Sequence, residues 1–369
     1  MATLTAPDSV SMDRMKLRQV EELFRQQIDD GLHPGAGLAV YRYGNLVLEL
    51  NGGLADIDTE QPVSDETMFV LMSSTKPLAA ACLYILKDQG QLAWDDPVSK
   101  FWPEFGGQGK QGVTINHILT HRGGFPETPK TLPWSDWSDW GKVVRAMEEA
   151  VPSLPPGEVL AYHPINYGWV IGELVRRIDG RPFDQFLAQE LTGPLAMNNT
   201  YVGLPANLEN RVSKMHLMED DADANGYVTT FNRPEVHRSI VPGACGIASA
   251  GDLARFYAVM ERGGTLDGAR IFGPDTVKEA TSLRIEGTDA TLGLFAQRSF
   301  GLALADERMG KSQGDPTKTF GHGGAGTSVG WADSESGLAV AYITNGFRSS
   351  DTNNPRLAAI SQAIRDACI

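Results

Sequence analysis

Residues 73–90 read SSTKPLAAACLYILKDQG: a polar tetrapeptide is followed at once by apolar residues at helical spacing. Gly90 is a typical helix terminator, and Pro77 falls in the first turn, where its missing N–H leaves no bond unmade. The pattern predicts a helix whose N-terminus carries Ser73 and Lys76 on one face. Free amides and the helix dipole at such a terminus favour developing negative charge.

A serine hydroxyl attacks nothing at neutral pH unless a base removes its proton, and a lysine three residues later can be that base. A chain of this length contains about one Ser-x-x-Lys by chance, so the spacing alone decides little. The pair Ser73 and Lys76 is the one such spacing in this sequence. Its place at a predicted helix start makes Ser73 a candidate nucleophile.

The composition indicates a globular, acidic protein. Its 369 residues are 41% hydrophobic and 21% charged, which is enough for two packed units. A net charge of −14 argues against a nucleic-acid or anionic-membrane partner, because both need a basic face, so we expect a small-molecule partner. Residues 1–20 lack the apolar core of a signal peptide, and no run of about 18 apolar residues occurs, which favours a cytoplasmic protein. No pattern indicates an oligomeric state.

Strand patterns lie at both ends of the chain, and helical patterns lie between them. Residues 12–31 predict an amphipathic helix, and apolar runs on either side of Gly44-Asn45 predict a β-hairpin with its turn there or one residue away. Further helices are predicted at 114–120, 140–150, 166–178, 183–191, 250–263 and from Pro355 to Ala367, and strands at 299–304, 327–332 and 338–344. The three cysteines, Cys82, Cys245 and Cys368, lack metal-ligand spacing and are predicted to be buried or free thiols.

A second serine motif competes with the first. Gly326-Thr327-Ser328-Val329-Gly330 matches the G-x-S-x-G elbow of α/β-hydrolases, which needs a following helix and a later histidine. No histidine follows Ser328, and the run continues into a predicted strand. We therefore interpret it as a glycine-rich strand edge.

Two further patterns suggest metal sites, and each is incomplete. Residues 221–226, DADANG, open like a calcium loop, but position twelve is Asn232 where a bidentate glutamate is needed. His117 and His121 have zinc-like i,i+4 spacing but lack the glutamate of zincins and a third ligand. A solvated loop and structural histidines are the better interpretations, and no metal is expected.

Trp134, Trp137 and Trp140 recur every three residues in WSDWSDW. On a helix they would share one face, which could be a wedge packed on the domain or the apolar wall of an acyl pocket. Both interpretations remain open from the sequence.

Several segments together resemble the serine β-lactamase and penicillin-binding protein superfamily, especially its class C β-lactamase-like carboxylesterases of the family VIII type. They occur in family order over nearly the whole chain: 69–76 (FVLMSSTK), 92–98 (LAWDDPV), 115–126 (INHILTHRGGFP), 162–164 (YHP), 246–249 (GIAS) and 320–326 (FGHGGAG). The ordered set is far more specific than any one member.

The resemblance implies an α+β fold: an antiparallel sheet flanked by helices, plus an inserted, mostly helical domain. Residues 1–68 and 240–369 would form the α/β domain and residues 69–239 the helical domain, with the active site at their interface. The strand, helix, strand order of the chain agrees with this expectation.

The resemblance also assigns roles to residues. Ser73 would be the acylated nucleophile, Lys76 its hydrogen-bonded partner and Tyr162 the tyrosine of the second motif, with Tyr167 as the rival. Which of Lys76 and Tyr162 is the ground-state base stays open. The backbone amides of Ser73 and Ala325 would form the oxyanion hole.

The third motif would contribute substrate-binding residues, namely His322, Gly323 and Gly324. Here the chain departs from β-lactamases, whose third motif begins with lysine followed by Thr-Gly or Ser-Gly. The missing lysine and hydroxyl remove donors for a substrate carboxylate, and His322 is at best partly charged at pH 7. Efficient β-lactam hydrolysis is therefore not expected.

The resemblance thus predicts a serine hydrolase that cleaves carboxylic esters through an acyl-Ser73 intermediate. No cofactor is expected, and the partner would be a small-molecule ester. The alternatives on the same site are an acyltransferase, a D-amino-acid amidase or peptidase, and a weak β-lactamase. A non-catalytic binding protein is a further alternative, although Ser73, Lys76 and Tyr162 are all present.

Overall fold

A computed structural model describes residues 3–369, and its central element is a nine-stranded antiparallel sheet in the order β10-β11-β12-β13-β14-β15-β1-β2-β3. The N-terminal hairpin pairs with the last long strand, so that Leu38 lies opposite Tyr342. The strands span Gly35–Arg42 (β1), Asn45–Asp56 (β2), Gln61–Pro62 (β3), Ile285–Thr288 (β10), Phe295–Arg298 (β11), Ala303–Leu304 (β12), Thr319–Gly324 (β13), Ser328–Asp333 (β14) and Leu338–Thr344 (β15).

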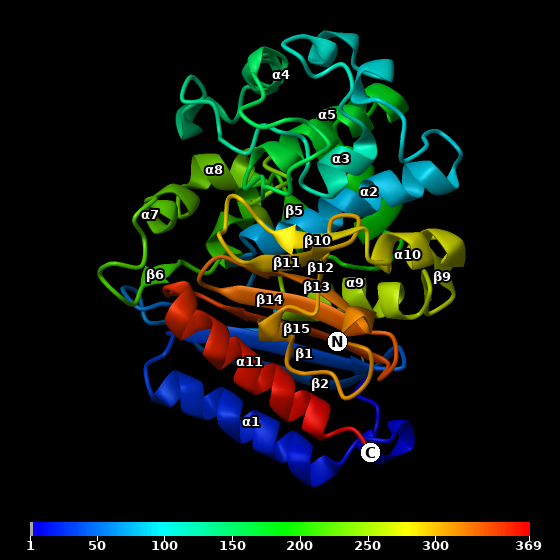
Figure 1. Ribbon diagram of the computed structural model, residues 1–369. Helices are drawn as coiled ribbons and strands as arrows, with labels where there is room; N and C mark the ends of the chain where they lie inside the picture. Colours follow the sequence, from blue (N-terminus) through cyan, green and yellow to red (C-terminus); the bar gives the residue numbers. More distant parts are fainter. Residues whose placement is uncertain (1–2) are drawn as a thin grey trace.

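Helices α1 (Arg14–Asp29) and α11 (Ser350–Asp366) lie side by side on one face of this sheet (Figure 1). Their apolar sides pack on sheet residues that include Val40 and Trp331, and burial of each large apolar side chain contributes about 1.5–3 kcal/mol. The other face carries α9 (Ala250–Glu261) and α10 (Pro274–Thr281). The sheet is thus the middle of three layers.

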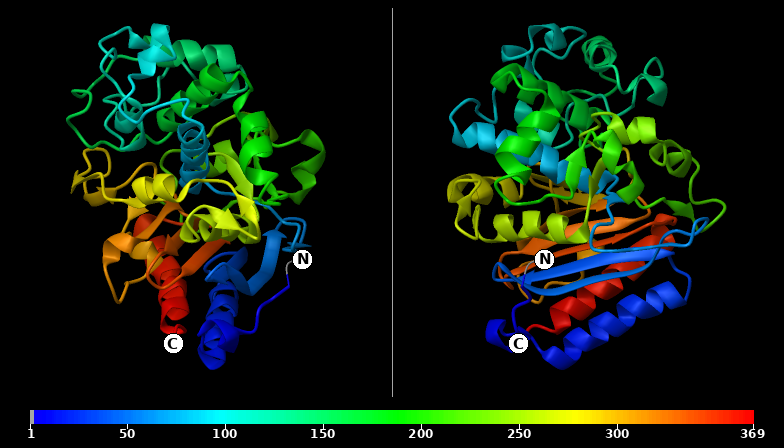
Figure 2. Two further views of the ribbon diagram at one scale, coloured as in Figure 1. Left: turned by 90° about the vertical axis from the view of Figure 1, so that its right-hand side faces the viewer. Right: turned by 180° about the vertical axis from the view of Figure 1, so that it is seen from behind.

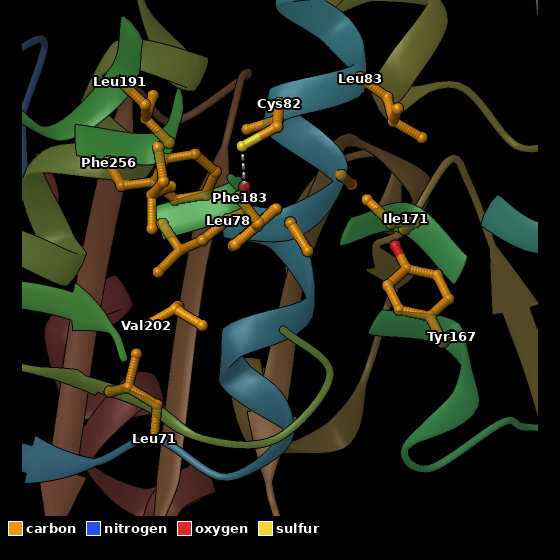
Figure 3. Packing of buried hydrophobic residues seen from close by; sticks show 14 of the residues in the cluster. Leu71, Leu78, Cys82, Leu83, Tyr167, Ile171, Phe183, Leu191, Val202 and Phe256 are labelled. Carbon is orange, nitrogen blue, oxygen red and sulfur yellow. Dashed lines mark hydrogen bonds between the residues drawn. The ribbon is translucent and has the colours of Figure 1, made fainter. Parts of the chain in front are cut away.

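Helical structure fills the space beyond α9, as Figure 2 shows from two further sides. Its helices are α2 (Lys76–Asp88), α3 (Ile115–Leu119), α4 (Trp140–Glu149), α5 (Asn166–Asp179), α6 (Phe183–Leu187), α7 (Tyr227–Phe231) and α8 (Pro234–Arg238). Helix α2 is buried along its length, and apolar side chains from several other elements surround it (Figure 3).

Three smaller sheets tie the parts together. One joins β4 (Phe69–Val70), β7 (Gly246–Ala248) and β5 (Thr200–Val202), and its first strand leads directly into the turn before α2. The others pair β6 (His216–Leu217) with β16 (Gly346–Phe347) and β8 (Thr265–Leu266) with β9 (Ala269–Arg270).

The fold class predicted from the sequence, an antiparallel sheet with flanking helices and further helical structure, is confirmed. The hairpin turn lies at Tyr43-Gly44, within the one-residue shift that the sequence left open, because Asn45 already pairs with Arg42. Two local predictions need correction. The last helix begins at Ser350, and Pro355 lies inside it, where the missing N–H of proline leaves one i→i−4 hydrogen bond unmade.

The second correction concerns residues 299–304, of which only Ala303–Leu304 form a strand. Gly301 breaks the segment with φ 78°, a conformation that favours glycine. Among residues 3–369, no helix is both long and apolar enough to cross a lipid bilayer. Cys82 and Cys245 are buried free thiols, and Cys368 is a partly exposed one.

Candidate active site

Ser73 opens a 3-10 turn that continues directly into α2. The preceding residue, Met72, adopts φ 49° and ψ −135°, a conformation that L-residues rarely adopt. The turn is fixed by Thr75, whose Oγ1 accepts a hydrogen bond of 2.7 Å from the amide of Gly246 on β7. Packing around the turn thus holds a strained backbone that presents the Ser73 hydroxyl.

Lys76 is fully buried, and its Nζ faces three oxygens. It lies 3.2 Å from Ser73 Oγ, 2.6 Å from the carbonyl oxygen of Pro164 and 2.7 Å from that of Gly243. Burial, and then the positive charge of Arg298, hold the pKa of Lys76 well below its usual value. A neutral amine has two hydrogens and one lone pair. If the two carbonyls accept the hydrogens, the lone pair faces the Ser73 hydroxyl.

Tyr162 is the better placed of the two candidate tyrosines. Lys76 Nζ lies 4.7 Å from the centroid of the Tyr162 ring and 5.8 Å from that of Tyr167. Burial raises the pKa of Tyr162 to about 12, and the neighbouring Ser73 hydroxyl offsets part of the rise. Within residues 3–369, neither its hydroxyl nor that of Tyr167 has a hydrogen-bond partner. Tyr167 instead packs among buried apolar residues beside α2 (Figure 3).

Three residues that the sequence did not assign to the site contact Tyr162 and hold it in place. The ring of His121 lies 4.7 Å from the Tyr162 ring, between centroids. Asp289 Oδ1 accepts a hydrogen bond of 2.9 Å from the Tyr162 amide, and the Arg298 guanidinium carbon lies 5.5 Å from the ring centroid. Asp289 and Arg298 come from the far end of the chain, and no local motif marks them.

Strand β13 runs beside the nucleophile turn. Ser74 Oγ donates to the carbonyl of His322 at 3.0 Å, and a Cβ at Gly324 would overlap the carbonyl oxygen of Leu71. Glycine is therefore required where the strand meets the turn. Ala325 follows directly, and neither its amide nor that of Ser73 donates any of the turn and loop hydrogen bonds found within residues 3–369.

His322 is buried, and its Nδ1 lies 2.7 Å from the carbonyl oxygen of Gly323. Burial, supported by nearby positive charge such as that of Arg298, holds the pKa of His322 well below its usual value. The imidazole is therefore neutral at pH 7 and cannot replace the missing lysine as a cation. The side-chain position of Gly323 is also occupied, because the guanidinium of Arg308 lies there.

A cavity of about 660 Å³ adjoins the site. Trp134 and Trp137 line it together with Tyr227, Phe231 and Ile165. Pro164 and Ile165 both line this cavity, and the carbonyl oxygen of Pro164 accepts a hydrogen bond from Lys76, so the cavity lies next to the lysine.

The three tryptophans do not share one helix face, because Trp134 belongs to a 3-10 turn, Trp134–Asp136, and Trp140 begins α4. Trp140 packs against Gly172 and donates its Nε1–H to Glu173. Two of the three thus form a cavity wall, and the third packs on the protein.

The rival serine, Ser328, is fully buried on β14. Its Oγ lies 3.0 Å from Ser74 Oγ and donates to the carbonyl of Leu71 at 3.0 Å. It therefore connects the strand to the nucleophile turn. No helix follows it, as the sequence indicated.

Residues of the two metal-like patterns make hydrogen bonds that stabilise the starts of helices. Asp223 accepts hydrogen bonds from the amides of Tyr227 and Val228 at the start of α7. His117 completes the capping box of α3 with Thr114. Within the described part of the chain, residues 3–369, no group of three His, Cys, Asp or Glu side chains could hold a metal ion.

Comparison with known proteins identifies the family of this chain. The sequence model of the beta-lactamase family matches residues 20–363. Over 364 residues, the chain is 29% identical to the esterase/beta-lactamase LipL of Mycobacterium tuberculosis, a match that covers 90% of this chain and 82% of LipL.

Two solved structures share the complete fold. A penicillin-binding protein homologue from Caulobacter crescentus matches with a TM-score of 0.86 and 30% identity over 99% of each chain. A family VIII carboxylesterase matches with a TM-score of 0.88 and 28% identity, over 96% of this chain and 98% of that one. Because the family match spans most of the sequence and these relatives share the whole fold, this protein belongs to the beta-lactamase family.

Proposed function

We propose that this protein is a carboxylesterase that acts through an acyl-Ser73 intermediate. The observation that carries the proposal is the buried Lys76 amine, 3.2 Å from Ser73 Oγ, with a pKa well below its usual value. Membership of the beta-lactamase family supports hydrolysis in general. The names of two relatives, an esterase/beta-lactamase and a family VIII carboxylesterase, favour esters.

In the first step, Lys76 takes the Ser73 proton as Oγ attacks the ester carbonyl carbon. The carbonyl oxygen becomes an oxyanion, and the amides of Ser73 and Ala325 would stabilise it. Because Tyr162 is a neutral phenol with a free hydroxyl, it can give its proton to the leaving alcohol while Lys76 returns its own to the tyrosine. Water then reverses the sequence and releases the acid.

This scheme makes Lys76 the ground-state base. A phenol with a pKa of about 12 is almost fully protonated at neutral pH, whereas a lysine amine with a strongly lowered pKa is available to accept a proton. Ester cleavage needs no lysine in the third motif, which agrees with a neutral His322. The cavity behind Trp134 and Trp137 would receive the acyl group.

The proposal is tested with Ser73→Ala and p-nitrophenyl butyrate. We expect kcat to fall to the background rate while circular dichroism and the unfolding midpoint stay unchanged. A fluorophosphonate probe should label the wild-type protein on the peptide that contains Ser73. Full esterase activity in folded Ser73→Ala, or a label on Ser328 instead, would show that another serine is the nucleophile.

A further inference from the structure

Asp289 is a fully buried carboxylate in the loop between β10 and β11, at the end of the sheet that lies next to the helical structure (Figure 1). Its Oδ1 accepts hydrogen bonds from the amides of Thr291 and Leu292 in the same loop, at 3.0 and 3.2 Å. The third amide that donates to Oδ1, at 2.9 Å, is that of Tyr162. Hydrogen bonds from amides to a carboxylate are charge-assisted, so this one oxygen fixes Tyr162 relative to the loop.

A further bond joins the loop to the segment that leads to Tyr162. The amide of Ala290 donates to the carbonyl of Leu160 at 2.9 Å. Within the loop, the amide of Asp289 donates to the carbonyl of Leu294, also at 2.9 Å. The loop is thus closed by its own bonds, and the backbone of residues 160–162 is attached to it at two points.

Arg298 balances the charge of Asp289 beside the tyrosine. Its Nη2 lies 3.7 Å from Asp289 Oδ2, which accepts no hydrogen bond within residues 3–369. Its guanidinium carbon lies 5.5 Å from the centroid of the Tyr162 ring. A buried carboxylate without a cation costs much free energy, so Arg298 stabilises the carboxylate while the three amides fix its orientation.

The position of the Tyr162 phenol depends on this backbone attachment. Within the described part of the chain, its hydroxyl has no hydrogen-bond partner that could hold the end of the side chain. A tyrosine has only two rotatable χ angles, so a shift of the backbone at residue 162 is carried to the hydroxyl. A displacement of about 1 Å at a reacting group can lower a rate about 100-fold.

Building on the proposed function, we propose that Asp289 is a positioning residue that holds Tyr162 where its phenol can protonate the leaving alcohol. In that step the bond between the acyl carbon and the alcohol oxygen breaks, the Tyr162 proton moves to this oxygen, and the Lys76 proton replaces it on the tyrosine. A p-nitrophenolate is a weak base and leaves without the proton, whereas an ethoxide does not. The contribution of Asp289 to the rate therefore grows as the leaving group becomes more basic.

The test compares ethyl butyrate with p-nitrophenyl butyrate, which share one acyl group and differ in the leaving group. Asp289→Ala leaves three amides without their acceptor. We expect its kcat/KM for ethyl butyrate to fall about 10-fold to 100-fold further than its kcat/KM for p-nitrophenyl butyrate. Asp289→Asn keeps an oxygen acceptor in the same place and should keep most of the wild-type ratio of the two values. Equal losses for both esters in folded Asp289→Ala, or a ratio in Asp289→Asn as low as in Asp289→Ala, would overturn the proposal.

Asp333→Ala is the matched control for the loss of a buried, amide-bonded carboxylate. Asp333 accepts hydrogen bonds from the amides of Glu335 and Ser336, and it pairs with Arg365 at 2.7 Å. It lies at the end of β14 away from the nucleophile turn. This variant should lower the unfolding midpoint and leave the ratio for the two esters unchanged.

Two further variants connect the effect to Tyr162. Tyr162→Phe removes the proton donor and sets the limit of the loss, so adding Asp289→Ala to it should lower the ratio no further. A further loss in the double variant would show that Asp289 acts through another group. If Asp289→Ala does not fold, Asp289→Glu takes its place, since the additional methylene moves the acceptor away from the amides while the charge is kept. An unchanged ratio in that variant would refute the positioning role.

Fluorophosphonate labelling keeps this proposal distinct from the assignment of the nucleophile. Fluoride is a weak base and leaves without a proton from Tyr162, so Ser73 in Asp289→Ala should be labelled at close to the wild-type rate. A labelling rate that falls as far as ethyl butyrate hydrolysis would show a general structural role and count against the proposal. Absence of label on wild-type Ser73 would instead refute the proposed nucleophile, which the ratio for the two esters does not test.

Discussion

Gly168 connects the packing of helix α5 to the position of Lys76. A Cβ added at Gly168 would overlap the amide nitrogen of Gly243 and approach its Cα to 2.6 Å and the carbonyl carbon of Pro242 to 2.5 Å. Atoms of the backbone cannot move aside as the end of a side chain can. The same Gly243 offers its carbonyl oxygen to Lys76 Nζ at 2.7 Å, so a shift of this loop moves the base.

The expected size of the Gly168→Ala effect follows from two opposing terms. Overpacking costs about 1–3 kcal/mol, and the better helix propensity of alanine returns up to about 1 kcal/mol. We therefore expect a net loss of about 1–2 kcal/mol in the free energy of unfolding. Because a displacement of about 1 Å can lower a rate about 100-fold, we expect kcat/KM to fall by about 10-fold to 100-fold.

Urea denaturation followed by tryptophan fluorescence measures the stability, and p-nitrophenyl butyrate hydrolysis measures the activity. Gly141→Ala is the matched control, since Gly141 lies in α4 and its added Cβ would approach nothing closer than the Asp139 carboxylate at 3.2 Å. This variant should be as stable as wild type or slightly more so, with full activity. Wild-type stability and kcat/KM in Gly168→Ala would refute the argument that backbone contact at Gly243 positions Lys76.

Two further predictions concern the base and the cavity. A lowered pKa keeps Lys76 neutral above that pKa, so the rate of Ser73 labelling by a fluorophosphonate should rise with pH and level off well below the usual lysine pKa of about 10.4. A labelling rate that still rises at pH 10 would contradict the lowered pKa. Lys76→Met should lower kcat/KM by about 10²–10⁴-fold. With p-nitrophenyl esters of increasing acyl length, kcat/KM should rise by up to about fourfold per methylene until the cavity is filled, since each buried CH₂ contributes about 0.8 kcal/mol. Trp134→Ala should flatten this series, and an unchanged slope would show that the acyl group lies elsewhere.

Much of the fold could be predicted from the sequence because its signals are local. Apolar spacing and flanking glycines located α1, α2, α5 and the β1–β2 hairpin to within a few residues. The short strands β10 and β11 were not predicted, because each has only four residues and β10 has no fully buried side chain. Such segments acquire strand structure from their neighbours in the sheet.

The candidate site likewise combines residues that are close in the sequence, which could be predicted, with residues that are far apart in it, which could not. The Ser73 and Lys76 pair was predicted from spacing within one helical turn, and the structure places the two side chains 3.2 Å apart. The partners of Lys76 come from positions 88 and 167 residues further along the chain, and no periodicity encodes such distances. The contact between Arg308 and Gly323 likewise could not be predicted, because it forms only when two strand-linked segments pack together.

The sequence by itself therefore determined that a serine and a lysine share one helical turn, and it predicted the succession of elements, since these depend on neighbours within a few residues. Only the tertiary structure decided that the Tyr162 ring lies closer to Lys76 Nζ than the Tyr167 ring does, that His322 is neutral and that the guanidinium of Arg308 occupies the side-chain position of Gly323. The physical reason is that pKa values and recognition depend on burial and on charges within a few ångströms, and these are set when distant segments pack together.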